Sequence, residues 1–246
     1  MTQRIAAVSG GMGGLGRATC LALARAGMRV VALDLPGDAA RRAAFDAAMH
    51  GHGVETVALD VGDPDACAAA IASIEATHGR LDVLVTAAGI TRDGTLRKMQ
   101  RAQWDDVLRI NLDGVFNLVQ PAVAGMVDRG FGRIVNISSV NGQTGQFGQS
   151  NYAAAKAGVH GFTMALAREV ARKGVTVNSI SPGYCDTPMV MAIPEAIRAG
   201  LVDQIPVGRL GRPEEIARVV GFLADDAAGF ITGANIPVNG GMFMSF

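Results

Sequence analysis

Short apolar runs alternate along the chain with longer segments in which apolar residues recur at helical spacing. The apolar runs predict buried strands at residues 4–9, 29–33, 54–59, 81–85, 132–137, 175–181 and 235–238. The helical segments cover residues 15–26, 38–49, 64–76, 101–127, 152–173 and 214–224. We expect Pro121 to interrupt the fourth of these helices, because proline removes a backbone donor. Strands that alternate with helices predict an α/β fold in which helices cover both faces of a parallel sheet.

No linker or repeat breaks this series, so we expect residues 1–246 to form a single domain. The predicted architecture is a Rossmann-like, doubly wound parallel sheet of about seven strands. In such sheets, ligands bind at the carboxyl ends of the strands, where the strand order switches direction. Residues that follow the predicted strands are therefore the first candidates for a functional site.

The composition excludes several classes of function. The chain has 22 Lys and Arg residues and 22 Asp and Glu residues, so its formal charge of zero gives no reason to expect nucleic acid as a partner. The three cysteines and four histidines lack the spacing of metal ligands, and we expect no metal site. No apolar stretch is long enough to span a membrane, and the first predicted strand leaves no room for a signal peptide. We therefore expect a cytoplasmic protein.

A glycine-rich turn joins the first predicted strand to the first predicted helix. Backbone N–H groups at such a helix start can face a pyrophosphate, and the helix dipole favours its negative charge. The second strand ends in Asp34, where a carboxylate can accept hydrogen bonds from an adenosine ribose. This order of strand, glycine turn, helix and acidic residue predicts a dinucleotide site. Its first candidate residues are Gly10, Gly11, Met12, Gly14, Leu15, Gly16 and Asp34.

Tyr152 and Lys156 lie four residues apart on a predicted helix, so their side chains share one face. A nearby ammonium favours the phenolate, and we expect Lys156 to lower the pKa of Tyr152. Ser139 follows the fifth predicted strand and can bring a hydroxyl to the same point. A carbonyl placed there would meet a hydrogen-bond donor and a proton donor. A Tyr and a Lys at this spacing also occur on ordinary surface helices, so the pair alone does not decide the function.

Taken together, the glycines Gly10, Gly14 and Gly16, with Asn111, Ser139, Tyr152 and Lys156, resemble the short-chain dehydrogenase/reductase family. The resemblance covers nearly the whole chain and implies a homotetrameric nicotinamide-dependent oxidoreductase. It implies that Asn111 holds a local helix distortion and a water that completes the proton relay from Lys156 to solvent. It also implies that Lys156 binds the nicotinamide ribose. Further cofactor-binding positions implied by the family are Asp60, Val61, Ala88, Gly89, Tyr152, Pro182, Gly183 and Thr187. The chain departs from the family at Thr86-Ala87-Ala88-Gly89, where Asn-Asn-Ala-Gly is usual.

Within the family, the chain resembles the acetoacetyl-CoA reductases of polyhydroxybutyrate synthesis. The resemblance rests on residues 89–93, 97–99, 140–143, 145–149, 160–164 and 181–184. It implies an acyl-CoA substrate, with candidate contacts at Asp93, Lys98, Ser139, Gln146, Gln149 and Tyr184. The two glutamines could instead only tie their loop together. Residues 187–207, which are amphipathic and bounded by prolines, are expected to form a substrate lid, and a surface helix pair is the alternative.

The cofactor is expected to be NAD(H) in preference to NADP(H). Asp34 places a negative charge where the 2′-phosphate of NADP would lie, and residues 11–13 offer no basic side chain. NADP(H) remains possible because Arg41 or Arg42 could reach that phosphate.

Two other functions stay open. One is a 3-oxoacyl reductase that acts on acyl carrier protein, for which Arg129, Arg168, Arg172 and Lys173 could contact the acidic carrier. The other is a dinucleotide-sensing protein without catalysis, which would be expected to have lost the Tyr-x-x-x-Lys pair.

Overall fold

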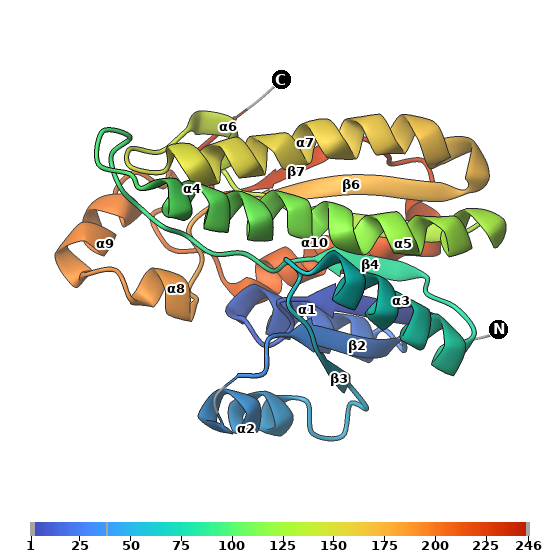
Figure 1. Ribbon diagram of the computed structural model, residues 1–246. Helices are drawn as coiled ribbons and strands as arrows, with labels where there is room; N and C mark the ends of the chain where they lie inside the picture. Colours follow the sequence, from blue (N-terminus) through green and yellow to red (C-terminus); the bar gives the residue numbers. More distant parts are fainter. Residues whose placement is uncertain (1–2, 38, 245–246) are drawn as a thin grey trace.

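The computed structural model describes residues 3–37 and 39–244, and its centre is one sheet of seven parallel strands (Figure 1). The strand order is β3-β2-β1-β4-β5-β6-β7. The strands are β1 Ile5–Ser9, β2 Arg29–Asp34, β3 Glu55–Ala58, β4 Val83–Thr86, β5 Gly132–Ile137, β6 Val175–Pro182 and β7 Asn235–Val238. The predicted doubly wound α/β fold is confirmed.

Helices cover both faces of the sheet, each with its own apolar core (Figure 1). The helices α3, α5 and α7 pack on one face, and α1, α2 and α10 pack on the other. The predicted helix start at Asp38 lies outside the described residues. The helices are α1 Gly14–Arg25, α2 Ala39–Ala48, α3 Pro64–His78, α4 Arg101–Leu108, α5 Gly114–Asp128, α6 Asn141–Thr144, α7 Ser150–Val170, α8 Pro188–Met191, α9 Glu195–Val202 and α10 Pro213–Ala224.

The strand order reverses at β1, which pairs with β2 on one side and β4 on the other. The register aligns the carboxyl ends of the central strands, because Ser9 pairs with Thr86 and Thr86 pairs with Asn136. The loops after β1, β4, β5 and β6 therefore leave the sheet at one edge. This edge is the switch point at which doubly wound sheets bind ligands.

The predicted interruption at Pro121 is wrong, since α5 runs through this proline without a break. The break in regular α-helix begins twelve residues before Pro121, where a π-helical turn, η1 Arg109–Asp113, joins α4 to α5. Proline removes only one backbone hydrogen bond. On either side of Pro121, Leu118, Val119 and Ala122 are buried, and their packing holds the helix together.

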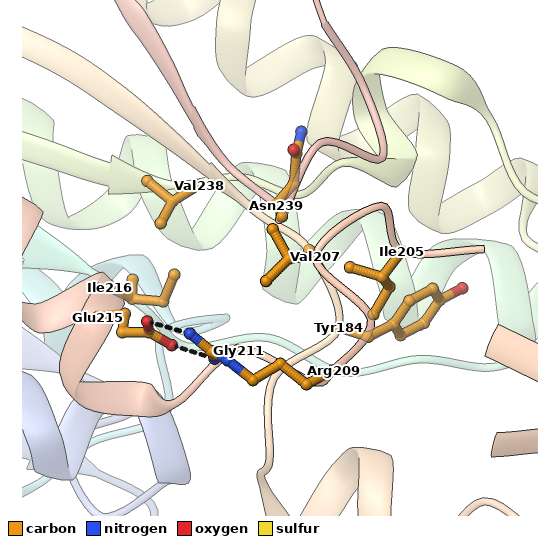
Figure 2. Close-up of a pocket in the computed structure, with 11 residues that line it drawn as sticks. Tyr184, Ile205, Val207, Arg209, Gly211, Glu215, Ile216, Val238 and Asn239 are labelled. Carbon is orange, nitrogen blue, oxygen red and sulfur yellow. Dashed lines mark hydrogen bonds and ion pairs between the residues drawn. The ribbon is translucent and has the colours of Figure 1, made fainter. Parts of the chain in front are cut away.

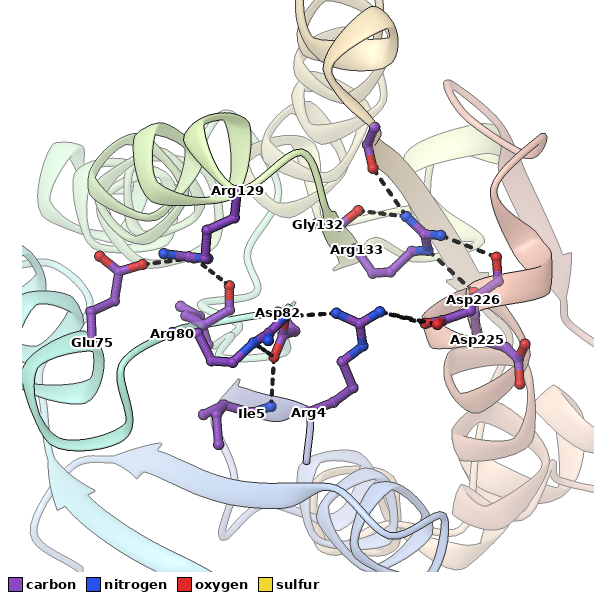
Figure 3. A network of polar contacts seen from close by, with 12 residues as sticks. Arg4, Ile5, Glu75, Arg80, Asp82, Arg129, Gly132, Arg133, Asp225 and Asp226 are labelled. Carbon is purple, nitrogen blue, oxygen red and sulfur yellow. Dashed lines mark hydrogen bonds and ion pairs between the residues drawn. The ribbon is translucent and has the colours of Figure 1, made fainter. Parts of the chain in front are cut away.

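The amino ends of the strands are joined by a buried ionic network around Asp82, which has no exposed surface (Figure 3). Its carboxylate accepts from Arg80 Nη2 at 2.6 Å, from Arg4 Nη1 at 3.2 Å and from the Ile5 backbone N–H at 2.9 Å. Arg4 also reaches Asp226 at 3.0 Å. This network fastens β1 to β4 at the edge opposite the switch point.

Candidate active site

The glycine turn lies against the loop that follows β4. Gly10 has φ +63°, and a Cβ there would come within 2.8 Å of Ala87 O and Ala88 N. The Ser9 hydroxyl accepts from the backbone N–H groups of Ala87 at 3.1 Å and Ala88 at 3.3 Å. Gly11 donates to Leu33 O at 3.2 Å, which ties the turn to β2.

The start of α1 fits a pyrophosphate. Gly13 caps this twelve-residue helix without a side-chain hydrogen bond, so the first N–H groups, around Gly14, Leu15 and Gly16, are open to a ligand. Gly14 lies against Thr187, which caps α8 by accepting from Val190 N at 3.5 Å. The structure thus brings together the predicted pyrophosphate and nicotinamide positions.

Asp34 lies at the end of β2 beside a cavity of about 160 Å³, lined in part by Met12, Arg42 and Ala58. One carboxylate oxygen, Oδ2, accepts both the Met12 backbone N–H and Arg41 Nη2, each at 2.8 Å. Arg42 instead pairs with Asp46 at 3.0 Å. The geometry suits an adenosine, and Asp34 already has a cationic partner.

Asp60 and Val61 follow β3, near the predicted adenine position. The Asp60 carboxylate accepts from Gly62 N at 2.8 Å and Arg109 Nη1 at 3.1 Å. Val61 is buried, and its carbonyl accepts from Asn117 Nδ2 at 2.9 Å. These contacts join the loop to η1 and α5, so it is anchored beside the site.

Ser139, Tyr152 and Lys156 come together at the start of α7. The Ser139 hydroxyl accepts from the Asn141 backbone N–H at 3.1 Å and lies close enough to the Tyr152 phenol to affect its pKa. Lys156 is buried, donates to Ile137 O at 2.8 Å, and lies 5.8 Å from the centre of the Tyr152 ring. The expected hydroxyl, phenol and ammonium therefore share one site.

The electrostatics of the pair differ from the expectation that Lys156 lowers the pKa of Tyr152. Burial raises this pKa; a hydrogen bond with Ser139 opposes the rise, and Asp93 and Tyr184 add to it. Burial also lowers the pKa of Lys156 from 10.5 to about 8. Both charged forms are disfavoured because both groups are removed from water.

Asn111 sits inside the π-helical turn, as the family resemblance implies. Its amide Nδ2 donates to Ile90 O and Val107 O, both at 2.9 Å, and its Oδ1 accepts from Ile90 N at 3.3 Å. A Cβ at Gly89 would lie 2.7 Å from Asn111 Oδ1 and 3.7 Å from Lys156 Nζ. A side chain at position 89 would collide with the Asn111 amide, so glycine is required where the β4 loop packs against these two residues.

A polar network extends from Ser139 to Asp93. Gln149 Nε2 donates to both oxygens of Asp93 at 3.0 Å, and Gln149 Oε1 accepts from Asn141 Nδ2 at 2.9 Å. Asn141 also lies close to the Tyr184 phenol, where it opposes the rise in the pKa of Tyr184 that burial causes. Asn141 is the residue that sequence reasoning missed, although its place two residues after Ser139 was a usable signal.

Two predicted substrate residues lie apart from this network. Gln146 and Lys98 are exposed, and across residues 3–37 and 39–244 no hydrogen bond or ion pair joins either side chain to it. The predicted lid region contains α8 and α9, with Met189 and Ile197 exposed. A helix pair is therefore present, and its action as a lid stays a prediction.

The turn after β6 is the predicted nicotinamide position, and backbone hydrogen bonds hold it to neighbouring segments. Pro182 O accepts from Val140 N at 2.8 Å, and Gly183 N donates to Val238 O at 3.0 Å. Beside it lies a cavity of about 130 Å³ (Figure 2). The Tyr184 hydroxyl points away from Ile216 and Val238, which line the opposite side of the cavity (Figure 2). An ion pair between Arg209 and Glu215 at 2.8 Å borders it.

Neither a metal site nor a membrane span is found among the described residues. No three His, Cys, Asp or Glu side chains of these residues gather in a way that could hold a metal ion. No helix there has the length and apolar character needed to cross a membrane.

Comparison with known proteins agrees with this geometry. The model of the family described as enoyl-(acyl carrier protein) reductase (adh_short_C2) matches residues 10–243. The acetoacetyl-CoA reductase of Allochromatium vinosum is 51% identical, over 98% of this chain and 99% of its own length. The 3-oxoacyl-[acyl-carrier-protein] reductase FabG of Pseudomonas aeruginosa is 45% identical, over 98% of each chain. The crystal structure of gox2181 superposes with a TM-score of 0.92 at 36% identity, over 98% of this chain and 96% of that one.

These matches and the arrangement of Ser139, Tyr152 and Lys156 define a class. The chain belongs to the short-chain dehydrogenase/reductase family and is a short-chain oxidoreductase that binds NAD(P)(H). Acetoacetyl-CoA reductases recur among its relatives at 51–53% identity.

Proposed function

We propose that the protein is an acetoacetyl-CoA reductase, which converts a 3-oxoacyl-CoA to the 3-hydroxyacyl-CoA. The observation that carries this proposal is the neutral polar network of Gln149, Asn141 and Tyr184 beside the Ser139–Tyr152 pair. A 3-oxo thioester offers two neutral oxygens, for which hydroxyl and amide donors are suitable partners. The names of the relatives point to the same substrate.

In the proposed mechanism, the nicotinamide cofactor supplies the hydride. Ser139 donates a hydrogen bond to the substrate oxygen and stabilises the charge that develops there. Tyr152 gives its proton to that oxygen, and its raised pKa keeps the phenol protonated at neutral pH. Lys156 binds the ribose hydroxyls, and Asn111 keeps the local helix distortion beside it.

Tyr152→Phe tests the proton donor. The variant keeps the packed ring but lacks the proton, so turnover should fall by about 10²- to 10⁴-fold. NADH binding, followed by nucleotide fluorescence, should stay near that of the wild type. Near-normal turnover would refute the role of Tyr152.

We further propose that NADH is preferred over NADPH. The carboxylate of Asp34 suits ribose hydroxyls and repels a 2′-phosphate. Arg41, at 2.8 Å from Asp34, weakens this repulsion and could itself contact a phosphate, so NADPH would bind less tightly rather than not at all. The test is kcat/KM and Kd for both cofactors in the wild type and in Asp34→Ala. The preference is wrong if the wild type favours NADPH or if Asp34→Ala gains no NADPH use.

The alternative substrate is an acyl-carrier-protein thioester, as the FabG relative suggests. The four basic residues considered for carrier binding lie at or near the ends of α5 and α7 remote from Tyr152, and Arg129 is paired with Glu75 at 2.8 Å. Within one chain, they therefore do not border Ser139 and Tyr152. Comparing turnover on acetoacetyl-CoA and on the matching carrier-protein thioester decides between the two substrates.

We also propose a cytoplasmic homotetramer. Large apolar side chains are exposed on α5, α7 and α10, namely Phe116, Met164 and Phe222, and such residues are typical of subunit interfaces. Light scattering coupled to gel filtration would measure the oligomeric state directly.

A further inference from the structure

Asp93 is held firmly although its side chain is exposed. The loop that carries it is joined to the segment before α7 by a backbone bond from Gly94 N to Gly148 O at 2.8 Å. Asn151 Nδ2 donates to Arg92 O at 3.1 Å on the other side. With Gln149 Nε2 donating to both carboxylate oxygens at 3.0 Å, the position of the charge is fixed from three directions.

This negative charge acts on the reacting groups. Burial raises the pKa of Tyr152 and of Tyr184, and the Asp93 carboxylate raises both further. The carboxylate thus makes any further negative charge near the two phenols less favourable.

This field distinguishes two forms of the proposed substrate. In a 3-oxo thioester the C1 group is neutral, whereas in the free 3-oxo acid C1 is a carboxylate only two bonds from the carbonyl carbon that reacts. Binding either carbonyl between Ser139 and Tyr152 brings its C1 group within a few ångströms of the polar network. We propose that Asp93 makes this site selective for neutral 3-oxo thioesters and esters by electrostatic exclusion of free 3-oxo carboxylates. The inference rests on the proposed function.

The positive charges nearby do not cancel this effect. Arg92 is paired with Asp106 at 3.6 Å, and Arg97 and Lys98 lie exposed on the turn beyond Asp93. The ammonium of Lys156 is bound to Ile137 O on the side of the catalytic pair. Among the described residues, Asp93 is the one charged side chain that hydrogen bonds join to Gln149 and, through it, to Asn141.

The test compares acetoacetate with methyl acetoacetate, which differ chiefly in the charge at C1 and both lack CoA. Asp93→Asn keeps the size and an acceptor for Gln149 but removes the charge. The ratio of kcat/KM for methyl acetoacetate to that for acetoacetate should fall about ten-fold or more in this variant. In the wild type, the same ratio should fall as salt rises from about 20 mM to about 500 mM, because salt screens the repulsion.

Asp128→Asn is the matched control, since it removes an exposed carboxylate at the end of α5 remote from Tyr152 and should leave the ratio unchanged. An unchanged ratio in Asp93→Asn, or an equal change in Asp128→Asn, would overturn the inference. If the wild type reduces acetoacetyl-CoA but the ratio responds neither to Asp93→Asn nor to salt, only the exclusion by Asp93 fails. If the wild type reduces neither acetoacetyl-CoA nor methyl acetoacetate, the proposed function fails, and the inference falls with it.

Discussion

Lys156→Met should make the protein more stable at pH 7 while it destroys the proposed activity. Lys156 is 4% exposed, and its ammonium makes one described hydrogen bond, to Ile137 O at 2.8 Å. Burying an ammonium with so little compensation is unfavourable, and burial accordingly lowers its pKa from 10.5 to about 8. Methionine has a similar length, fills the same space and carries no charge.

The magnitude follows from the two pKa values. The gap between 10.5 and about 8 corresponds to roughly 3 kcal/mol of instability at pH 7, at about 1.4 kcal/mol per pH unit. Losing the hydrogen bond to Ile137 costs about 1 kcal/mol. We therefore expect the free energy of unfolding of Lys156→Met to exceed that of the wild type by about 2 kcal/mol.

The gain should depend on pH in a defined direction. Between pH 8 and pH 10.5, the unfolded wild-type chain holds a proton on Lys156 that the folded chain has released. The wild-type free energy of unfolding therefore rises through this window, and the advantage of the variant shrinks. Below pH 8, the advantage is fully present.

The assay is urea denaturation of both proteins without nucleotide, at pH 7 and in steps above pH 8. The protein concentration is held constant, because association would shift the apparent stability. Lys173→Met, at an exposed lysine beyond the end of α7, is the control and should change stability by less than about 0.5 kcal/mol. A variant less stable than the wild type at pH 7, or a difference that does not vary with pH, would refute the reasoning.

Three other changes test other parts of the structure. Lys98→Ala should raise KM for acetoacetyl-CoA more than KM for a truncated thioester without the nucleotide; an equal rise would mean that Lys98 does not contact the CoA moiety. Gln149→Ala and Tyr184→Phe should each weaken acetoacetyl-CoA use several-fold while the Kd for NADH, measured by fluorescence, stays close to normal; a matching loss of NADH affinity would contradict a substrate role. Asp82→Asn should lower the free energy of unfolding by about 3 kcal/mol, because it removes the buried negative charge that Arg80 and Arg4 share. A loss under about 1 kcal/mol would show that the network contributes little to stability.

The strands could be predicted from the sequence because their signals are local. A fully buried parallel strand is an unbroken apolar run, and in this chain such runs end at a glycine, an aspartate or a polar loop. The predicted run at residues 175–181, for example, corresponds to β6 at Val175–Pro182. The residues that follow the strand ends could then be assigned to one edge by topology alone.

The π-helical turn could not be located from local pattern. Pro121 gives the stronger local signal of a break, but the turn is held by bonds from Asn111 to Ile90, 21 residues away. For a similar reason, local pattern does not predict the pKa of Tyr152. Its spacing from Lys156 is visible in the sequence, whereas the burial of both groups depends on the whole fold.

Thr86 and Ala87 stand where the family usually has two asparagines. Other side chains hold the backbone of this loop in place. Thr86 Oγ1 donates to Asn136 at 2.9 Å, and Asn136 Nδ2 donates in turn to Thr163 at 3.0 Å, which links β4, β5 and α7. The next two N–H groups both reach the Ser9 hydroxyl. A serine in the glycine turn therefore sets the course of the loop that reaches Gly89. Because Gly89 packs against the Asn111 amide and lies near the buried Lys156 ammonium, the Ser9 hydroxyl, which is far from both residues in sequence, helps to position the loop beside them.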